Sequence, residues 1–417
     1  MIPPLAEVEV RPVVGDELEL TCERLVHRGL GLCHHQGQVV FVFGALPGER
    51  VRVRVTAARA RHLRADVIEV QRPAEGRVVP PCPVFGVCGG CQLQHAAYPL
   101  QLEAKRGVLE DELDRRGLAL PADTRVVGSR RPYGYRWRGE FHRGAGGRLG
   151  FTSRHGYQNV PVSDCPIHRE SINAALSGVG RALEGEGAQA RTVSLTAVDE
   201  GVLVQVRPDS GASSRVALAA AEEGGPLLGT ESGALDYLGR SFRTTANSFI
   251  QVNQETLPDL YEPVLEWLGP EVDSQLVVDA YAGSGVLSVR LADLGAQVVA
   301  VESNPTSARL AQLHAQMYGG GRVEVRRGEV EEELPRLRDC RAVVLDPPRS
   351  GLAPQVRGWL SLAGPKMVAY LSCEVSALGR DLETLCRLGP YRLERLLLVD
   401  MFPQTYHFEV AAMMRRS

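Results

Sequence analysis

Cys373 follows directly on an apolar run, KMVAYLS, and is itself followed by an acidic residue, Glu374. A cysteine in such a place is usually a small hydrophobic side chain of the core. A thiolate is also the best available side chain for adding to an electron-poor ring carbon, because it is strongly nucleophilic near neutral pH. Cys373 is therefore a candidate nucleophile if other reactive groups lie beside it.

A glycine-rich segment, DAYAGSG, begins at Asp279 and places Gly283 and Gly285 between an apolar run and a helical pattern. Glycines there let the backbone approach a ligand closely. Glu302 ends the next apolar run, where an acidic side chain can bind ribose hydroxyls. Ser288 stands where a dinucleotide fingerprint has its third glycine, which disfavours NAD(P). The pattern predicts a nucleoside cofactor rather than a purely structural turn.

Asp346 lies in the segment LDPPR, at the end of another apolar run. Two consecutive prolines cannot continue a strand ladder, so they force an extended, exposed turn. Alone, this motif would be a plain loop. Next to a cofactor site, Asp346 could accept hydrogen bonds from the cofactor or from a substrate base.

Four further cysteines form a separate constellation. Cys82, Cys88 and Cys91 lie in one short segment rich in proline and glycine, and Cys165 follows later, in DCPIH. Clustered cysteines in a reducing compartment more often bind metal or do chemistry than form disulfides. The first gap of five residues does not fit the radical S-adenosylmethionine enzymes. Four thiolates suit either tetrahedral zinc or an iron–sulfur cubane, and the spacing does not choose between them.

From about residue 275 the sequence alternates regularly between strand and helix patterns. The segments QLVVDAY, QVVAVES, RAVVLDPP and KMVAYLSC predict strands with helices between them. We expect a doubly wound, Rossmann-like α/β sheet, which binds ligands at the carboxyl ends of its strands. The glycine-rich segment, Glu302, Asp346 and Cys373 all fall at such ends. This shared placement favours a catalytic role for Cys373 over core packing.

Residues 13–70 predict a small all-β unit. VGDELELT and VRVRV alternate between apolar and polar residues, VVFVF is a short buried strand, and turn signals separate them. About five short strands indicate an OB-like barrel. This unit also carries a group of arginines: Arg50, Arg52, Arg54, Arg59, Arg61, Arg64 and Arg72. A β-surface made basic in this way is typical of RNA binders, although a solvated strand face has the same composition.

The middle of the chain predicts a mixed α+β unit. A helix is expected over 98–116, and strand patterns such as TVSLTAV and GVLVQV alternate with turn-rich stretches over about 120–265. This region opens with SRRPYGYRWRGEF, in which arginines interleave with aromatic residues. Arginine and aromatic side chains together supply phosphate neutralisation and base stacking.

Size and composition limit the class of protein. The chain has 417 residues and a net charge of −3, so two or three folding units are expected and any nucleic-acid surface must be local. The first residues, MIPPLAEVEVRP, lack the pattern of a signal peptide, and no run of about 18 apolar residues occurs. We predict a cytoplasmic protein that makes no membrane contact.

Together these motifs resemble the TrmA/RumA family of RNA 5-methyluridine methyltransferases, over nearly the whole chain. HRGLGLCHHQGQVVFVFGALPGERVRVRV is similar to the TRAM RNA-binding domain, and PPCPVFGVCGGCQLQHAAY to the family's iron–sulfur segment. YRWRGEF, SFIQVN, DAYAGSG, LDPPRSG, LSC and MFPQTYHFE then follow in the family's order. The combination of TRAM and iron–sulfur segments resembles the RumA/RlmD-type branch, which modifies 23S ribosomal RNA.

The resemblance implies a role for each matching residue. Cys373 matches the nucleophile and Glu409, in MFPQTYHFE, the general base. Asp346 is implied to contact the cofactor, the uracil N3 edge or both. The positions implied to bind S-adenosylmethionine are Gln251, Tyr281, Glu302, Glu329 and Asp346. A [4Fe-4S] cluster is implied on Cys82, Cys88, Cys91 and Cys165.

The implied reaction explains these residue types. Carbon 5 of uracil is a poor nucleophile, and addition of the Cys373 thiolate to carbon 6 makes an enolate whose carbon 5 can attack the sulfonium methyl. Stabilising the developing oxyanion lowers the barrier. Glu409 then removes the proton from carbon 5, and the cysteine is eliminated. The target base must leave its stack to reach both groups.

The chain also departs from the family's pattern. Glu374 and Val375 follow the nucleophile, where the family usually has Asn-Pro. Ala282 stands in the cofactor loop where a cysteine is common, and Val286 where Asn or Asp is frequent. An acidic neighbour such as Glu374 is expected to raise the pKa of the Cys373 thiol.

The expected architecture is a TRAM β-barrel over residues 1–72, a central domain with the iron–sulfur segment over 73–265, and a methyltransferase domain over 266–417. The expected partner is RNA, most specifically 23S ribosomal RNA, and the expected oligomeric state is a monomer. Transfer RNA is the alternative substrate. A cytosine-5 methyltransferase is disfavoured because its paired Pro-Cys and Thr-Cys motifs are missing. A non-catalytic RNA-binding iron–sulfur protein is disfavoured because both Cys373 and Glu409 are present.

Overall fold

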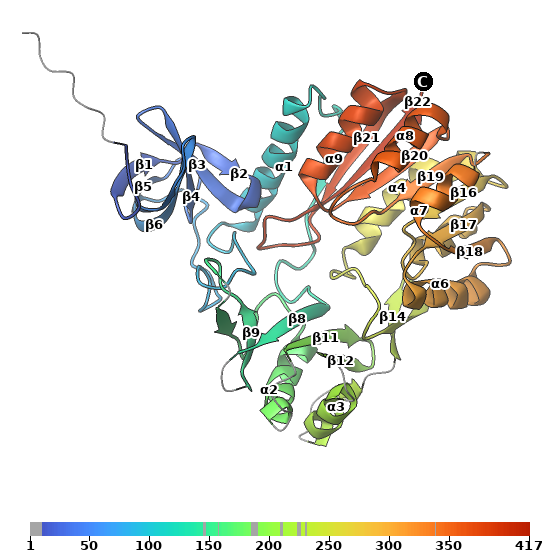
Figure 1. Ribbon diagram of the computed structural model, residues 1–417, viewed down its shortest axis with the longest axis horizontal. Coiled ribbons are helices and arrows are strands. Elements are labelled where there is room, and N and C mark those ends of the chain that lie inside the picture. The colour runs from blue at the N-terminus through green and yellow to red at the C-terminus, as the bar shows by residue number, and fades with distance from the viewer. Residues whose placement is uncertain are drawn as a thin grey trace, which may run out of the picture.

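The described part of the chain folds around three sheets and a two-stranded ribbon, seen in the computed structural model of Figure 1. The first ten residues, which include most of the segment searched for a signal peptide and the start of the predicted TRAM unit, lie outside the described residues. The described residues are 11–144, 147–156, 158–184, 191–208, 212–222, 227–229, 232–337 and 339–417.

The N-terminal sheet is the small all-β unit that the sequence predicted. It has six strands in the order β1-β5-β6-β4-β3-β2, one more than expected. Alternation along β5 buries the valines at 51, 53 and 55 and leaves the arginines between them outside. Its elements are β1 (Glu17–Thr21), β2 (Arg24–Val26), a 3-10 turn η1 (His27–Gly29), β3 (Leu30–His35), β4 (Gln38–Phe43), β5 (Arg50–Ala58) and β6 (His62–Arg72).

Part of the predicted basic surface of this sheet is neutralised within the sheet itself. Arg50 pairs with Glu19, and both Arg52 and Arg54 pair with Glu17. These acidic partners come from β1, which runs antiparallel beside β5. The arginines of β5 are therefore ion-paired on a strand face, which weakens the expectation that they bind RNA.

The central sheet follows the cysteine-rich segment and the helix α1 (Tyr98–Arg115), which begins where the sequence predicted. The sheet has the order β10-β9-β8-β11-β12-β13, and α2 (Glu170–Glu184) and α3 (Ala212–Glu222) pack on it. A ribbon of β14 (Ser232–Tyr237) and β15 (Arg240–Thr245) leads onward. The strands are β8 (Arg138–Arg143), β9 (Leu149–Thr152), β10 (Asn159–Pro161), β11 (Thr192–Val198), β12 (Gly201–Arg207) and β13 (Leu227–Gly229).

The C-terminal sheet confirms the predicted doubly wound arrangement. Its eight strands have the order β18-β17-β16-β19-β20-β22-β21-β7, and helices cover both faces. The strands are β7 (Arg125–Val127), β16 (Leu276–Ala280), β17 (Gln297–Glu302), β18 (Val323–Arg327), β19 (Ala342–Leu345), β20 (Met367–Ser372), β21 (Tyr391–Val399) and β22 (Glu409–Arg416). The helices are α4 (Leu257–Val272), α5 (Val286–Asp293), α6 (Pro305–Tyr318), α7 (Val330–Glu333), α8 (Pro354–Ala363) and α9 (Val375–Leu382).

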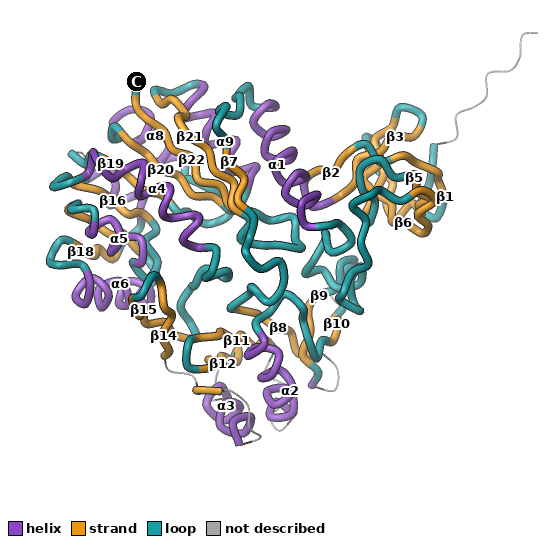
Figure 2. The backbone as a smooth tube through the Cα atoms, turned by 180° about the vertical axis from the view of Figure 1, so that it is seen from behind, coloured by secondary structure: helices purple, strands orange, loops and turns teal. Residues whose placement is uncertain are grey.

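One segment of the middle region belongs to the C-terminal sheet in space. The strand β7 (Arg125–Val127) pairs in parallel with β21, and α1 packs beside α9 (Figure 2). The predicted domain boundaries after residues 72 and 265 stay predictions. No described helix combines the length and the apolar composition that a membrane span requires.

A buried ion pair fixes α1 to the end of β21. Lys105 Nζ lies 2.7 Å from Asp400 Oδ1, and the two side chains are 2 % and 0 % exposed. Lys105 also donates to the carbonyl of Phe402 at 3.1 Å. Removing one partner of such a pair leaves an uncompensated buried charge, which is far more destabilising than losing a surface pair.

We therefore expect Lys105→Met to lower the free energy of unfolding by about 3–5 kcal/mol, measured by urea denaturation. The chain's only other lysine, Lys366, is half-exposed and lies 3.6 Å from Glu271. Lys366→Met is the matched control and should cost less than about 1 kcal/mol. Equal urea midpoints for the two variants would contradict a structural role for the buried pair.

Candidate active site

The loops that could do chemistry meet at one edge of the C-terminal sheet. The strands β16, β17, β19 and β20 run parallel, so their carboxyl ends share this edge. The last strand, β22, runs antiparallel to β20, and Ser372 pairs with Val410. This register brings Glu409, the first residue of β22, beside Cys373, which directly follows β20. The sequence could place Cys373 at the edge, whereas the approach of Glu409 comes from strand pairing.

The Cys373 thiol is held in its neutral form. Burial raises its pKa to about 12, and the nearby Glu409 and Asp346 carboxyls raise the pKa in the same direction. The Arg349 guanidinium opposes them. Glu374 is not among the groups that contribute most to this shift, and its carboxylate lies 4.0 Å from His27 Nε2 of the turn η1. The acidic groups that raise this thiol pKa most, Glu409 and Asp346, lie at the start of β22 and after the end of β19.

Glu409 and Asp346 are themselves perturbed acids. Burial raises the pKa of Glu409 well above its usual range, and the charge of Asp346 adds to the effect. Burial and the nearby Asp279 raise the pKa of Asp346 to about 7. Gln251 Nε2 donates to Asp346 Oδ2 at 3.4 Å, so a residue of the loop after β15 reaches this edge. The site gathers acidic groups that a cation would stabilise in their charged forms.

The glycine-rich segment forms a tight turn after β16. Tyr281, Gly283 and Gly285 all have positive φ, and a Cβ on Gly285 would approach Ala311 of α6 to 3.0 Å. The Glu302 carboxylate accepts a hydrogen bond from the Gly283 N–H at 2.8 Å, which ties the ends of β16 and β17 together. At Gly283, by contrast, an added Cβ would meet no atom within 4 Å beyond its chain neighbours, so the backbone of the turn is open to a ligand there.

Three residues in or near this loop have contacts within the protein or a defined place at the sheet edge. Ser288, at the missing third glycine, donates a hydrogen bond to the buried Asp279. Tyr281 donates through its hydroxyl to Glu331, 3.4 Å away, and not to Glu329. Glu329 precedes the first residue of α7, just after β18. Both glutamates therefore lie at the sheet edge, and only Glu331 bonds to the cofactor loop.

The four predicted metal-ligating cysteines converge away from this edge. Cys91 and Cys165 are buried in one cluster with Tyr135, and burial raises their thiol pKa values to about 12 and about 11. Cys82 and Cys88 lie near enough to raise the pKa of Cys165 further. The Gly90 N–H donates to the Cys88 sulfur at 3.4 Å. Among the described residues, no three His, Cys, Asp or Glu side chains are arranged as ligands of a single metal ion.

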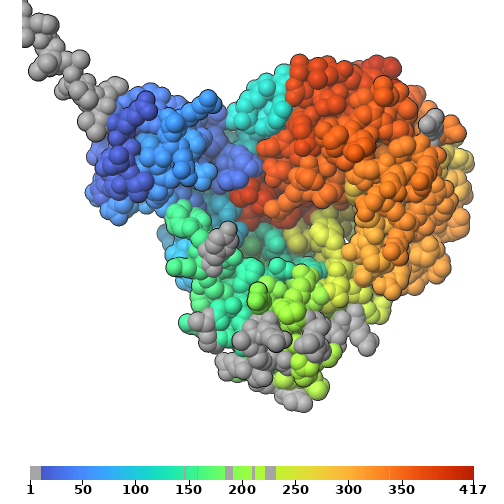
Figure 3. Space-filling model, viewed as in Figure 1, coloured from blue at the N-terminus to red at the C-terminus, as the bar shows by residue number. Residues whose placement is uncertain are grey.

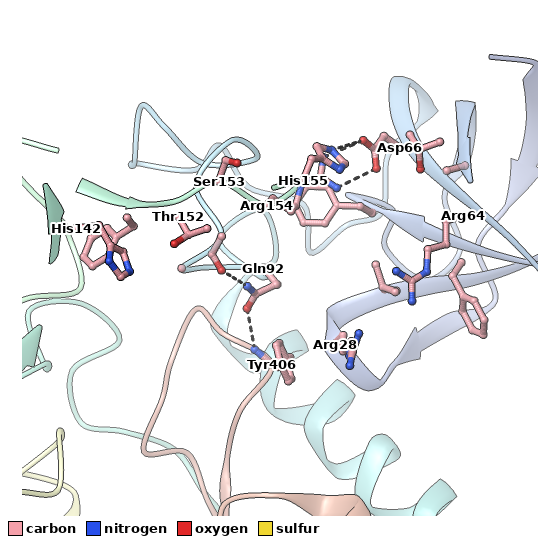
Figure 4. A pocket seen from close by; sticks show the side chains of 18 residues that line it. Arg28, Arg64, Asp66, Gln92, His142, Thr152, Ser153, Arg154, His155 and Tyr406 are labelled. Atoms are coloured by element: carbon pink, nitrogen blue, oxygen red, sulfur yellow. Dashed lines mark hydrogen bonds and ion pairs between the residues drawn. The ribbon is translucent and has the colours of Figure 1, made fainter. Parts of the chain in front are cut away.

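A pocket of about 540 Å³ opens where the N-terminal sheet, the cysteine-rich segment and the central sheet meet. Figure 3 shows the surface recessed between the N-terminal sheet and the rest of the molecule. Arg28, Arg64 and Tyr406 surround the same open space in Figure 4. Neither arginine makes an ion pair with any residue that the structure describes. On the rim, Arg154 is neutralised by Asp66, to which both its terminal nitrogens donate.

Sequence reasoning missed two contributors to these sites. Arg349 was quoted within LDPPR without a role, yet it is the cation that lowers the pKa of both Cys373 and Glu409. Its position directly after the double proline was the available signal. Tyr406 was quoted within MFPQTYHFE, and nothing in the sequence shows that it lines a pocket with Arg28.

Two family models match the chain. The model described as tRNA (Uracil-5-)-methyltransferase matches residues 234–417, and the TRAM domain model matches residues 12–68. The chain is 31 % identical to the 23S rRNA (uracil(1939)-C(5))-methyltransferase RlmD of Shewanella amazonensis, over 96 % of each chain. It is 30 % identical to an uncharacterized RNA methyltransferase of Thermosynechococcus vestitus, over 97 % of this chain and 99 % of that protein.

A solved structure shares the fold. The tRNA (uracil-54, C5)-methyltransferase of Pyrococcus abyssi, in complex with S-adenosyl-L-homocysteine, superposes with a TM-score of 0.74. The match covers 95 % of this chain and 100 % of that one, at 23 % identity. At this identity the likeness supports the arrangement of the elements and nothing about substrate.

The raised thiol pKa predicts how Cys373 reacts. Between pH 6 and 9.5 its alkylation by iodoacetamide, followed by peptide mass spectrometry, should accelerate about tenfold per pH unit with no plateau, because only the thiolate reacts. Arg349→Ala should slow alkylation at fixed pH about three- to tenfold, because the guanidinium that lowers the pKa of the thiol is removed. A plateau below pH 8 would show that the thiol is not held neutral.

Proposed function

The chain belongs to the RNA (uracil-5-)-methyltransferase family, and we propose that it methylates carbon 5 of a uridine in 23S ribosomal RNA. The observation that carries the proposal is the pairing of β20 with β22, which sets Cys373 beside Glu409 at the edge that holds the glycine-rich loop. The substrate class comes from relatives such as the Shewanella enzyme, named for uracil 1939 of 23S rRNA. Transfer RNA is the alternative substrate.

In the proposed reaction Cys373 forms a covalent adduct with the target base. Its thiolate adds to carbon 6, and the electron pair of the ring double bond moves toward carbon 5 and the carbonyl oxygen. S-adenosylmethionine, when bound, supplies an electrophilic methyl group to carbon 5. Glu409 then takes the proton from carbon 5 as the bond from sulfur to carbon 6 breaks, which restores the ring double bond.

The charges of the site explain how ligands prepare these groups. In the protein alone, Cys373, Glu409 and Asp346 have raised pKa values, so they favour their neutral forms. The reaction needs a thiolate and, later, a carboxylate. A bound sulfonium cation, together with Arg349, favours both ionised forms. Asp346, which accepts a hydrogen bond from Gln251, is proposed to hydrogen-bond the uracil edge or the donor.

The remaining donor contacts are proposed on the same sheet edge. The carboxylate of Glu302 is fixed by backbone N–H groups of Gly283 and Asn304, at 2.8 and 2.6 Å, and retains lone pairs for ribose hydroxyls. Tyr281, which belongs to the glycine-rich turn, is proposed to contact the donor as well. Glu329 is proposed to lie near the adenine of the donor, because it follows β18 at this sheet edge.

We also propose that Cys82, Cys88, Cys91 and Cys165 hold a [4Fe-4S] cluster. Their convergence, and the Gly90 N–H aimed at the Cys88 sulfur, fit a thiolate-bound cluster. In a cubane each thiolate binds a different iron, so the four sulfurs need not converge on one ion. Iron and acid-labile sulfide in anaerobically purified protein would test this assignment. Stoichiometric zinc without iron would contradict it.

The free arginines of the pocket are the proposed contact with RNA flanking the target. Arg28→Ala and Arg64→Ala should each weaken RNA binding and reduce the slope of log affinity against log salt by about 0.7–0.9, as one phosphate contact is lost. Fluorescence anisotropy over a salt series measures this. Arg50→Ala is the control, because Arg50 is already paired with Glu19 and should leave the slope unchanged. An unchanged slope in both pocket variants would remove this surface from the RNA site.

Methyl transfer itself tests the function. Purified protein with tritiated S-adenosylmethionine should label unmodified 23S rRNA, and Cys373→Ala should abolish the labelling while RNA binding persists. With 5-fluorouridine RNA the wild type should form an adduct that survives denaturing electrophoresis, because fluorine at carbon 5 cannot leave as a proton. Labelling of transfer RNA but not of 23S rRNA would identify transfer RNA as the substrate instead. Near-normal activity of Cys373→Ala would overturn the mechanism.

A further inference from the structure

The segment that delivers Glu409 is a long loop held from several sides. We call residues 400–408 the base loop; it joins β21 to β22 and ends at Glu409. At its neck Val399 pairs with Glu409. Beyond that pair the loop runs toward α1 and the N-terminal sheet (Figure 1). Strand pairing fixes Glu409 on the sheet side only, so the loop's other contacts decide how firmly the carboxylate is placed.

Gln404 is the central point of the base loop. It has a φ of 70°, uncommon for a residue other than glycine, and is only 2 % exposed. Its N–H donates to Gln101 Oε1 at 2.9 Å, and Gln101 Nε2 donates back to Gln404 Oε1 at 3.0 Å. The Gln404 carbonyl accepts from the N–H groups of Gln92 and Leu93, at 3.0 and 2.9 Å. Its side-chain amide donates to the carbonyl of Pro132 at 3.3 Å.

Gln92 makes a second link between the cysteine-rich segment and the base loop. Its side chain donates to the Gly89 carbonyl at 2.8 Å and accepts from the Tyr406 N–H at 3.4 Å, as the dashed lines of Figure 4 show. Because Gln92 directly follows Cys91, the segment that carries three of the four clustered cysteines is bonded to the loop at two points. The buried Tyr135 adds a hydrogen bond from its hydroxyl to the Pro403 carbonyl, at 3.0 Å.

We propose that Gln92 and Gln404 are positioning residues for Glu409, which hold the base loop so that the carboxylate reaches the proton on carbon 5. The inference rests on the proposed function. The hydrogen bonds described above join both side chains to the base loop and its neighbours, so each can act on Glu409 through the backbone of the loop. Gln92 also lines the pocket proposed to contact RNA, so RNA binding by the Gln92→Ala variant is measured beside its kcat. Misplacing a reacting group by about 1 Å can cost a hundredfold in rate, so a loosened loop would act on catalysis without touching substrate.

The proposal separates two steps of the reaction. Cys373 follows β20 and does not belong to the base loop, so addition to carbon 6 and methyl transfer should proceed when the loop is loosened. Elimination then breaks the hydrogen–carbon 5 bond and the sulfur–carbon 6 bond. The proton goes to the Glu409 carboxylate, and the electron pair forms the ring double bond as the thiolate leaves. If Glu409 is misplaced, the methylated covalent adduct should accumulate.

The test uses RNA with ordinary uridine, for which the wild type should show little adduct at steady state. Gln92→Ala and Gln404→Ala should each lower kcat about ten- to a hundredfold. Each should raise the fraction of protein bound covalently to RNA on denaturing gels several-fold, with little change in the KM for S-adenosylmethionine. Tritium from the methyl donor should appear in the adduct.

Gln205→Ala is the matched control. Gln205 is a buried glutamine of β12 whose side-chain hydrogen bonds among the described residues are with Asn247 and Arg207, outside the base loop. Its variant should lose stability without accumulating adduct. Gln92 is only half-buried, so Gln92→Ala should fold even if Gln404→Ala does not.

Folded Gln92→Ala protein with a lowered kcat and no methylated adduct, or with wild-type kcat, would overturn the inference while wild-type methylation continues. Absence of methylation and of 5-fluorouridine adduct in the wild type would instead overturn the proposed function, and the inference with it.

Discussion

The antiparallel register between β20 and β22 is the constraint on which the site depends. A fully parallel sheet would bring the start of its last strand to the opposite edge from the ends of the others. Because β22 is reversed, its first residue meets the end of β20, and the pair Ser372 with Val410 places Glu409 next to Cys373. A shift of one residue would turn the side chain of Glu409 to the other face of the sheet. The nucleophile and the base are thus aligned by backbone hydrogen bonds rather than by contact between their side chains.

Electrostatics at this edge couple ligand binding to chemistry. The edge gathers Asp279, Asp346, Glu409 and a partly buried thiol, and Arg349 is the cation that lowers the pKa of both Cys373 and Glu409. Neutral forms are therefore favoured until positive charge arrives. Such an arrangement keeps a strong nucleophile protonated, and hence less open to oxidation, while the site is empty.

Local patterns in the sequence were sufficient for the α/β unit, because each strand end carries its own motif within a few residues. The start of α1 and the placement of Cys373 were predicted in this way. Contacts between distant segments were not, since nothing in RVRVRV shows that Glu17 and Glu19 lie across the strand from its arginines. Likewise, the motif MFPQTYHFE suggested a base, but Gln404 meets Gln101 across 303 positions of sequence.

These distant contacts limit the order in which parts of the chain can fold during synthesis. Residues 98–127 are made early, yet β7 needs β21 as its partner and Lys105 needs Asp400, 295 positions later. Until the end of the chain has been synthesised, Lys105 has no partner and the apolar face of α1 stays exposed to water. The N-terminal sheet pairs only strands made within residues 17–72 and can close at once. Folding from the N-terminus is therefore expected to pause in the middle of the chain and to finish only when the last strand has emerged.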